Sequence, residues 1–185
     1  FFAGFSGGPK MIAPGLAGID TVLTLHDAAR IGHPDATWGV IEGNPVHDDV
    51  RAIARVAPPD FSMDVVLNSD QEVTGLYAGE LFAMHVAACA QAKLDSMQPV
   101  TRPFDLVVTS NSGYPLDQNL YQAVKGMSAA ARVVKPGGLI VCASECRDGI
   151  PDHGSYSEIL SSRPDPASLM QMIETPGYSE PDQGQ

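Results

Sequence analysis

The sequence predicts an α/β protein that holds parts of two α/β domains, the second with a Rossmann-like βαβ parallel sheet. In residues 104–144, two apolar, strand-like runs flank an amphipathic segment with helical spacing, which is the order of a βαβ unit with a right-handed crossover. In residues 61–95, two shorter strand-like runs precede a long segment rich in Ala, Leu and Met. Between them, residues 96–103 contain two prolines and no apolar periodicity, which is typical of a domain boundary.

This junction divides the chain into three parts. We place the end of a first domain at 1–97, a hinge at 98–103, and an incomplete, Rossmann-like C-terminal domain at 104–185.

In the first part, apolar spacing and helix stop signals predict the elements. Residues 1–15 are rich in glycine and proline around a single lysine, so we expect a loop. The second predicted helix starts at Asn44 or Pro45 and stops before Pro58-Pro59, because proline cannot continue a helix. The predicted helices are 15–29, 46–56 and 79–95, the predicted strands are 61–68 and 73–78, and a loop rich in Gly, Pro and Asp covers 31–45.

In the second part, the FDLVVTS run at 104–110 and the run at 139–144 are apolar almost throughout, so both are predicted to be buried strands. An amphipathic helix is predicted between them at 119–134. Pro136-Gly137-Gly138 is predicted to be the turn that follows this helix.

Composition and charge disfavour several classes of protein. With 44% hydrophobic and 18% charged residues, the chain has the composition of a globular protein with a packed core. A net charge of −11 repels phosphate backbones, so we expect no nucleic-acid partner. No apolar run approaches the ~20 residues that a membrane span needs, so we expect no membrane partner. Three cysteines do not form a disulfide framework, which favours the cytoplasm.

The first motif that could carry chemistry is Ser6-Gly7-Gly8-Pro9-Lys10. Adjacent glycines let the backbone approach a ligand and point successive N–H groups at an anion. Lys10 could pair with a phosphate or act as a nucleophile. The alternative is a glycine-rich turn with a solvated lysine. The segment matches neither GxxxxGK[ST] nor GxGxxG, so it is not a standard phosphate-binding loop.

The second candidate is His26, near the end of the first predicted helix. A neutral imidazole is a common ligand of nickel and zinc, whereas a lone histidine is more often a structural residue. The other histidines form no HxxxH or HExxH pair, so the sequence contains no recognisable all-protein metal cage.

The third candidate lies in the segment 114–125, which runs from a turn after a predicted strand into a helix. Ligands bind at this carboxyl end of the strands in parallel α/β sheets. Asp117 or Asn119 could cap the helix. Tyr121, Gln122 and Lys125 share one helix face at three- and four-residue spacing, which suits a small carboxylate. The alternative is a solvated first turn that carries one cation.

A fourth segment, Val133-Val134-Lys135-Pro136-Gly137-Gly138-Leu139-Ile140-Val141, resembles a late strand of class I S-adenosylmethionine-dependent methyltransferases. In those enzymes the K-P-G-G turn is structural. The glycine loop that holds their cofactor is not found upstream in this chain.

Taken together, the first and third motifs resemble the nickel-pincer lactate racemase family of 2-hydroxy-acid racemases and epimerases. The similarity covers nearly the whole chain and is strongest in SGGPKMIAPGLAG at 6–18, EGNPVHDDV at 42–50 and GYPLDQNLYQAVKGM at 113–127. Several separated motifs in the same order are more specific than any one of them.

The resemblance implies a cofactor and a role for each candidate residue. A pyridinium-3,5-dithio mononucleotide would be covalently attached to Lys10, with nickel bound by the cofactor and by His26. Ser6, Gly7 and Gly8 would bind the cofactor's phosphate, and residues 1–97 would then be the end of the cofactor-tethering domain. Tyr121, Gln122 and Lys125 would face a small 2-hydroxy acid. The implied reaction is removal of the hydroxyl proton with reversible hydride transfer from Cα, through a planar 2-oxo acid.

The chain departs from the family pattern in two places. The family's catalytic histidines lie before the lysine loop, and this chain begins at Phe1 in that loop, so we expect an inactive fragment. Asp182-Gln183-Gly184-Gln185 stands where several relatives have a tryptophan, which favours a substrate larger than lactate. Two alternatives remain open: a cofactor-free homologue that binds small carboxylates, and a methyltransferase-like domain. The sequence leaves the oligomeric state undetermined.

Overall fold

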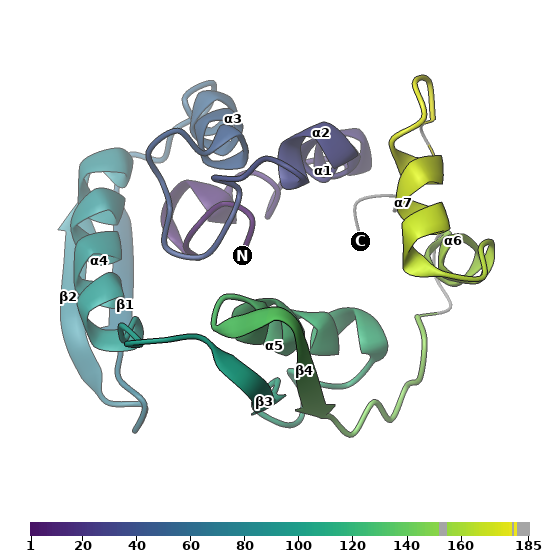
Figure 1. Ribbon diagram of the computed structural model, residues 1–185. Coiled ribbons are helices and arrows are strands. Elements are labelled where there is room, and N and C mark those ends of the chain that lie inside the picture. The colour runs from purple at the N-terminus through teal and green to yellow at the C-terminus, as the bar shows by residue number, and fades with distance from the viewer. Residues whose placement is uncertain (152–154, 179, 181–185) are drawn as a thin grey trace. The chain divides into compact units, whose positions relative to one another are not determined.

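The computed structural model describes residues 1–151, 155–178 and 180 and divides into two compact units (Figure 1). One unit runs from Phe1 to Gln98 and the other begins at Pro99. The predicted α/β class is confirmed, because each unit combines a two-stranded sheet with helices. The division coincides with the start of the segment 98–103, whose role as a hinge stays a prediction.

The first unit begins with short helices around a small apolar core. These are η1 (Gly8–Met11), α1 (Ile19–Leu25), α2 (Ala28–Ile31) and α3 (Pro45–Ala54). The core joins the N-terminal segment to α1 and α3 through Ala3, Leu25, Ala36, Val46 and Val50, with Phe2 and Ile53 packed against it. The residue before His26 therefore shares a core with the residues just before the glycine loop.

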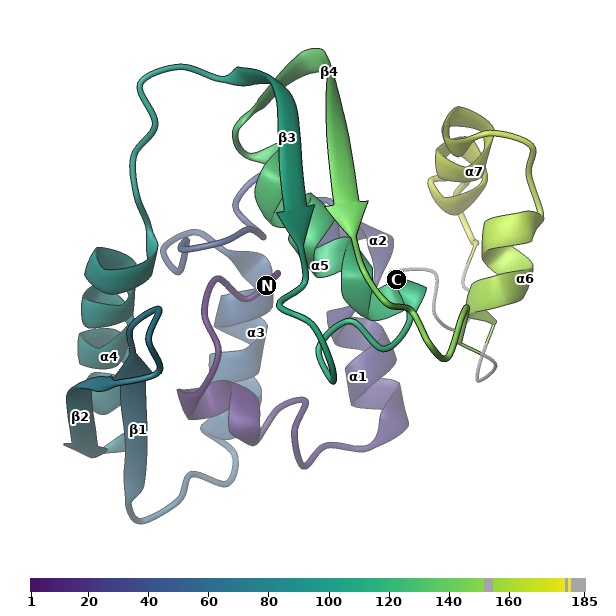
Figure 2. The ribbon, with the colours of Figure 1, turned by 90° about the horizontal axis from the view of Figure 1, so that it is seen from below.

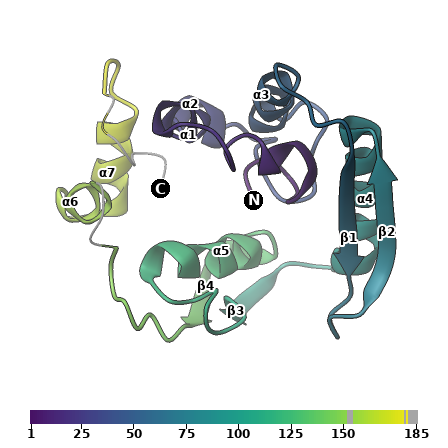
Figure 3. The same ribbon diagram turned by 180° about the vertical axis from the view of Figure 1, so that it is seen from behind.

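The rest of the first unit is a hairpin with a helix on it. Strands β1 (Ser62–Leu67) and β2 (Val73–Gly79) pair in antiparallel fashion, with Val65 opposite Leu76. Helix α4 (Leu81–Ser96) lies along one face of this hairpin (Figure 3). Both predicted strands and the long predicted helix are confirmed to within two residues at each end.

The second unit contains the predicted βαβ arrangement. Strands β3 (Phe104–Ser110) and β4 (Val134–Ala143) are parallel, with Val107 opposite Ile140, and α5 (Leu120–Ala131) connects them. Helix α5 packs against one face of the pair (Figure 2). Helices α6 (Tyr156–Ser161) and α7 (Pro166–Ile173) follow.

The prediction that these parallel strands are buried is wrong for the part of the chain that the structure describes. Leu106, Val108 and Leu139 are 52%, 70% and 60% exposed. Val107 and Thr109, on the alternate face, are partly buried. A strand that is apolar on both faces needs a cover on both, and within the described ranges only α5 covers this sheet.

Three predicted boundaries are corrected. The helix expected at 15–29 is two short helices, because Asp27 leaves the helical conformation and its carboxylate accepts a hydrogen bond from the Arg30 backbone N–H. The helix expected to reach 134 ends at Ala131. Pro136-Gly137-Gly138 lies inside β4 rather than in a turn before it, at a register shift in which Val134 pairs with Phe104 and Leu139 with Leu106.

Candidate active site

The glycine loop turns sharply into η1, which carries Lys10. Gly7 and Gly8 have φ angles of 74° and 50°, in the left-handed region that favours glycine. Pro9 is buried, and Lys10 is half-buried, with its backbone N–H donating to the Gly7 carbonyl at 3.2 Å. The element after the glycines is a four-residue 3-10 helix, so the loop is not followed by a long helix dipole.

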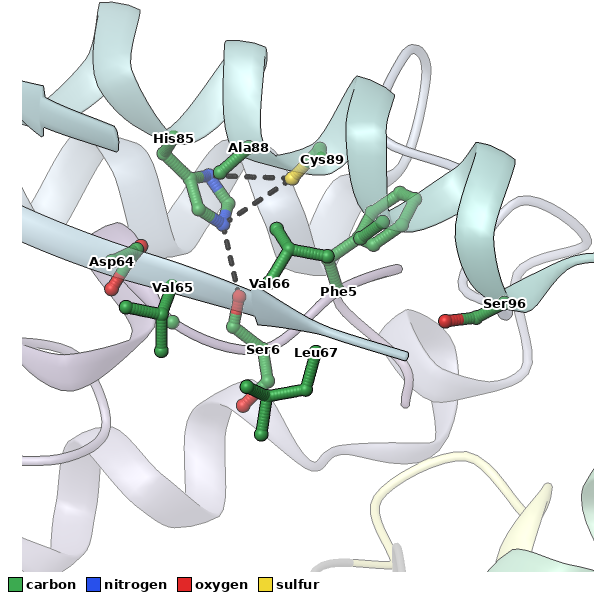
Figure 4. A pocket seen from close by; sticks show the side chains of 12 residues that line it. Phe5, Ser6, Asp64, Val65, Val66, Leu67, His85, Ala88, Cys89 and Ser96 are labelled. Carbon is green, nitrogen blue, oxygen red and sulfur yellow. Dashed lines mark hydrogen bonds between the residues drawn. The ribbon is translucent and has the colours of Figure 1, made fainter. Parts of the chain in front are cut away.

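Two side chains from later in the chain contact this loop (Figure 4). The Asp64 carboxylate, on β1, accepts a hydrogen bond from the Gly8 N–H at 2.8 Å. The His85 Nε2, on α4, lies 3.1 Å from the Ser6 carbonyl oxygen. Since the Gly8 N–H already points at a carboxylate, a phosphate at that position would meet like charge. The expected phosphate contacts of Ser6 and Gly7 stay predictions.

His26 follows the last residue of α1 and is half-buried. Its Nδ1 lies 2.7 Å from the Val22 carbonyl oxygen. A carbonyl can only accept, so Nδ1 carries the proton and Nε2 keeps its lone pair. This is the arrangement in which histidine binds a metal, with the second nitrogen held by a backbone carbonyl. The Phe2 ring also stands nearly perpendicular to the imidazole, at 6.3 Å between centroids.

The predicted face of α5 is formed as expected from its spacing. The Lys125 ammonium donates to the Gln122 amide oxygen at 2.5 Å and lies 5.8 Å from the centre of the Tyr121 ring. Burial lowers the pKa of Lys125, because removing an ammonium from water is unfavourable. A bound carboxylate would offset that cost.

The start of α5 is held in place by polar contacts. Asn119 caps the helix by accepting from the Gln122 N–H, whereas Asp117 accepts from the Glu145 N–H at 2.9 Å. Of the two capping candidates, Asn119 is therefore the one that caps. Asp117 ties the turn after β3 to the segment after β4, which places both carboxyl ends of the strands near the Tyr121 face.

Sequence reasoning missed several residues at these places. Asp64, His85 and Cys89 lie at the glycine loop, and Tyr156 packs edge-on against Tyr121 at 6.0 Å between ring centroids. The only local signal was the four-residue spacing of His85 and Cys89 in a predicted helix. Residues 182–185, where the tryptophan difference was predicted, lie outside the described residues. In the described ranges, no group of three His, Cys, Asp or Glu side chains could hold a metal ion.

Comparison with known proteins identifies the family. A model of the lactate racemase N-terminal domain matches residues 1–39, and a model of the lactate racemase C-terminal domain matches residues 100–185. Together they match more than half of the chain. The chain belongs to the lactate racemase family.

Individual members of the family are similar along the whole chain. A lactate racemase of Thermoanaerobacterium thermosaccharolyticum is 41% identical over 185 residues, which are 99% of this chain and 43% of that protein. A lactate racemase of Lactiplantibacillus plantarum is 40% identical over 95% of this chain and 41% of its own length. The structure of the lactate racemase apoprotein from T. thermosaccharolyticum matches with a TM-score of 0.91 at 39% identity, over all of this chain and 44% of that one.

The chain thus spans about two fifths of the length of the family members it matches. The match of residues 100–185 also assigns the K-P-G-G segment to this family rather than to methyltransferases. None of the helices in the described ranges is long and apolar enough to cross a membrane.

Proposed function

We propose that the protein containing this chain racemises or epimerises a small 2-hydroxy acid with a nickel-pincer cofactor. The observation that carries the proposal is the fixed tautomer of His26 in a chain of the lactate racemase family. In the neutral ring the Nδ1–H is bound by the Val22 carbonyl, which leaves Nε2 as the nitrogen that can bind a metal ion. We place the enzyme in the cytoplasm.

The first unit supplies the residues that would hold the cofactor. Lys10 would be the covalent attachment point of the pyridinium-3,5-dithio mononucleotide, and His26 would bind its nickel. Ser6 and Gly7 would lie beside its phosphate, while Gly8 contributes the backbone shape and not a donor, because its N–H is bound by Asp64. When bound, this group supplies a reversible hydride acceptor.

The α5 face would hold the substrate. The Lys125 ammonium pairs with the substrate carboxylate, and Gln122 holds that ammonium in place through its amide oxygen. The half-buried setting strengthens this pairing, because charges attract more strongly where water is partly excluded. The Tyr121 ring lies 5.8 Å from the Lys125 ammonium and, with Tyr156 packed against it, forms an aromatic wall.

The test uses the full-length protein produced in a host that makes the cofactor. We expect added mass on the peptide that contains Lys10 and none in Lys10→Ala. His26→Ala should keep the added mass and lose most of the nickel, because it removes the proposed protein ligand. Lys125→Met should lose 2-hydroxy-acid turnover, while Lys125→Arg keeps the charge and should retain part of it.

An unmodified Lys10 in such a preparation would contradict the proposal. If small carboxylates then bound with equal affinity in the presence and absence of nickel, and Lys125→Met abolished that binding, the protein would be a cofactor-free carboxylate-binding homologue instead.

A further inference from the structure

The glycine loop is contacted from two sides by polar groups that no catalytic step uses, the part-buried carboxylate of Asp64 and the buried imidazole of His85. We propose that Asp64 and His85 are positioning residues that clamp the Ser6–Gly8 backbone and thereby present Lys10 for attachment of the cofactor. The role of Lys10 in this inference rests on the proposed function. The clamp itself rests on the contacts of Asp64 with Gly8 and of His85 with Ser6.

Asp64 forms the first arm of the clamp. Its Oδ2 accepts from the Gly8 N–H at 2.8 Å, although the two residues are 56 positions apart in the sequence. The same carboxylate lies against Gly7, where an added Cβ would be 2.8 Å from Oδ2. Both glycines have positive φ, a backbone conformation that favours glycine, and the missing side chain of Gly7 lets the Asp64 carboxylate lie against the backbone. The carboxylate therefore fits this particular backbone path.

His85 forms the second arm. Its side chain is buried, at 3% exposure, and the Ser6 carbonyl lies 3.1 Å from Nε2. Because a carbonyl accepts only, Nε2 carries the proton and donates it to Ser6. A Cβ on Gly8 would collide with the His85 imidazole, so the ring packs directly on the loop. The His47 ring, stacked at 5.9 Å between centroids, and the Cys89 sulfur, at 3.4 Å from Nε2, confine the imidazole further.

The position of these polar groups argues against a purely structural role. Removing an imidazole or a carboxylate from water lowers the stability of the fold, relative to an apolar side chain, unless its hydrogen bonds are made within the protein. Here those bonds go to Ser6 and Gly8, on either side of Gly7. Gly8 also begins η1, which carries Lys10 two residues later. Ser6, Gly7, Asp64 and His85 also line a pocket of about 320 Å³, so one side of the loop and the clamp borders open space.

The test compares paired variants of the full-length protein, produced with the cofactor-synthesis enzymes. Asp64→Ala removes the acceptor and His85→Ala removes the donor. Asp64→Asn keeps an oxygen that can accept from Gly8, and His85→Gln keeps an N–H that can donate to Ser6. Met84→Ala, also buried on α4, removes volume without removing a hydrogen bond to the loop and serves as the control. The readouts are the fraction of Lys10 peptide that carries added mass, the exchange rate of the Gly8 amide hydrogen, and the unfolding midpoint.

We expect both alanine variants to exchange the Gly8 amide about 5- to 100-fold faster and to carry less added mass on Lys10. Asp64→Asn and His85→Gln should recover most of the wild-type values, and Met84→Ala should lower the unfolding midpoint without changing either loop readout. Equal modification and exchange in wild type and alanine variants, or an equal loss in Met84→Ala, would overturn the clamp.

The two proposals fail separately. If wild-type Lys10 carries no added mass, the proposed cofactor is wrong, and amide exchange at Gly8 alone decides the clamp. Faster exchange in Asp64→Ala with recovery in Asp64→Asn would then support it, and unchanged exchange would refute it.

Discussion

His26 and His85, both in the first unit, differ in role because their ring nitrogens have different hydrogen-bond partners. The Nδ1 of His26 is bound by a carbonyl, which leaves Nε2 with its lone pair in a half-buried place. His85 is instead buried, and its Nε2–H is bound by the Ser6 carbonyl. The first histidine suits a metal, and the second suits a fixed hydrogen bond to the loop.

Gly8→Ala is expected to destabilise the protein for two reasons. Its φ of 50° is strained for alanine, which costs about 1–3 kcal/mol. The new Cβ would also collide with the His85 ring. Gly43→Ala, with φ of 73° and its nearest atom at 3.5 Å, has the strain without the collision and is the matched control. Denaturant unfolding should show a larger loss of the free energy of unfolding for Gly8→Ala.

A double-mutant cycle separates the two reasons. In a His85→Ala background the collision is absent, so Gly8→Ala should cost less than it does in wild type. Additive losses would show that the ring does not pack on Gly8 as described.

At the scale of elements, α3 depends on a buried cap. Asn44 is fully buried, and its side-chain oxygen accepts from the N–H groups of Val46 and His47. Its amide nitrogen donates to the carbonyls of Phe2 and Val40. One side chain therefore starts α3 and ties it to the segment that leads into the glycine loop.

Replacing this cap should destabilise the first unit. Asn44→Ala leaves buried N–H and C=O groups without partners, and we expect a loss of about 2–3 kcal/mol in the free energy of unfolding. Asn44→Asp keeps the acceptor but places a buried carboxylate oxygen against the Phe2 and Val40 carbonyls, so it should destabilise the protein at least as much as alanine. Chemical denaturation followed by circular dichroism would measure the series, and a loss under about 0.5 kcal/mol for Asn44→Ala would contradict the role.

For the molecule as a whole, the histidine pair of the first unit links stability to pH. Burial lowers the pKa of His47, and the positive charges of His85 and Arg51 lower it further, against opposite effects of a backbone hydrogen bond with Ala3 and of Asp48. Burial also lowers the pKa of His85, and here the Ser6 carbonyl and Asp64 act in the opposite direction. Below the ordinary value of about 6.5, the unfolded chain therefore binds more protons than the folded one.

The free energy of unfolding should consequently be retained above about pH 6.5. It should fall as the pH drops through that value, by at most about 1.4 kcal/mol per pH unit for each histidine. Unfolding free energies measured between about pH 7.5 and pH 5.5 would test this. His47→Gln should flatten the dependence. Equal slopes in wild type and His47→Gln would refute the assignment to the pair.

Much of the fold follows from local pattern. The FDLVVTS run forms β3 over the predicted residues, and Tyr121, Gln122 and Lys125 meet on one face because three- and four-residue spacing brings side chains together on any helix. Helix breaks were harder to predict, because the cap at Asp27 is supported by its ion pair with Arg30, and Arg30 is in turn held by Asp49 on α3.

The sequence by itself determined the α/β class, the parallel pair of strands and the candidate residues Lys10, His26 and Lys125, since these depend on spacing and on motifs. Only the tertiary structure decided what surrounds the Ser6–Lys10 loop. Asp64 and His85 reach it from 56 and 79 residues away, on β1 and α4. Contacts at such separation depend on how the hairpin and its helix pack, and no local periodicity encodes them.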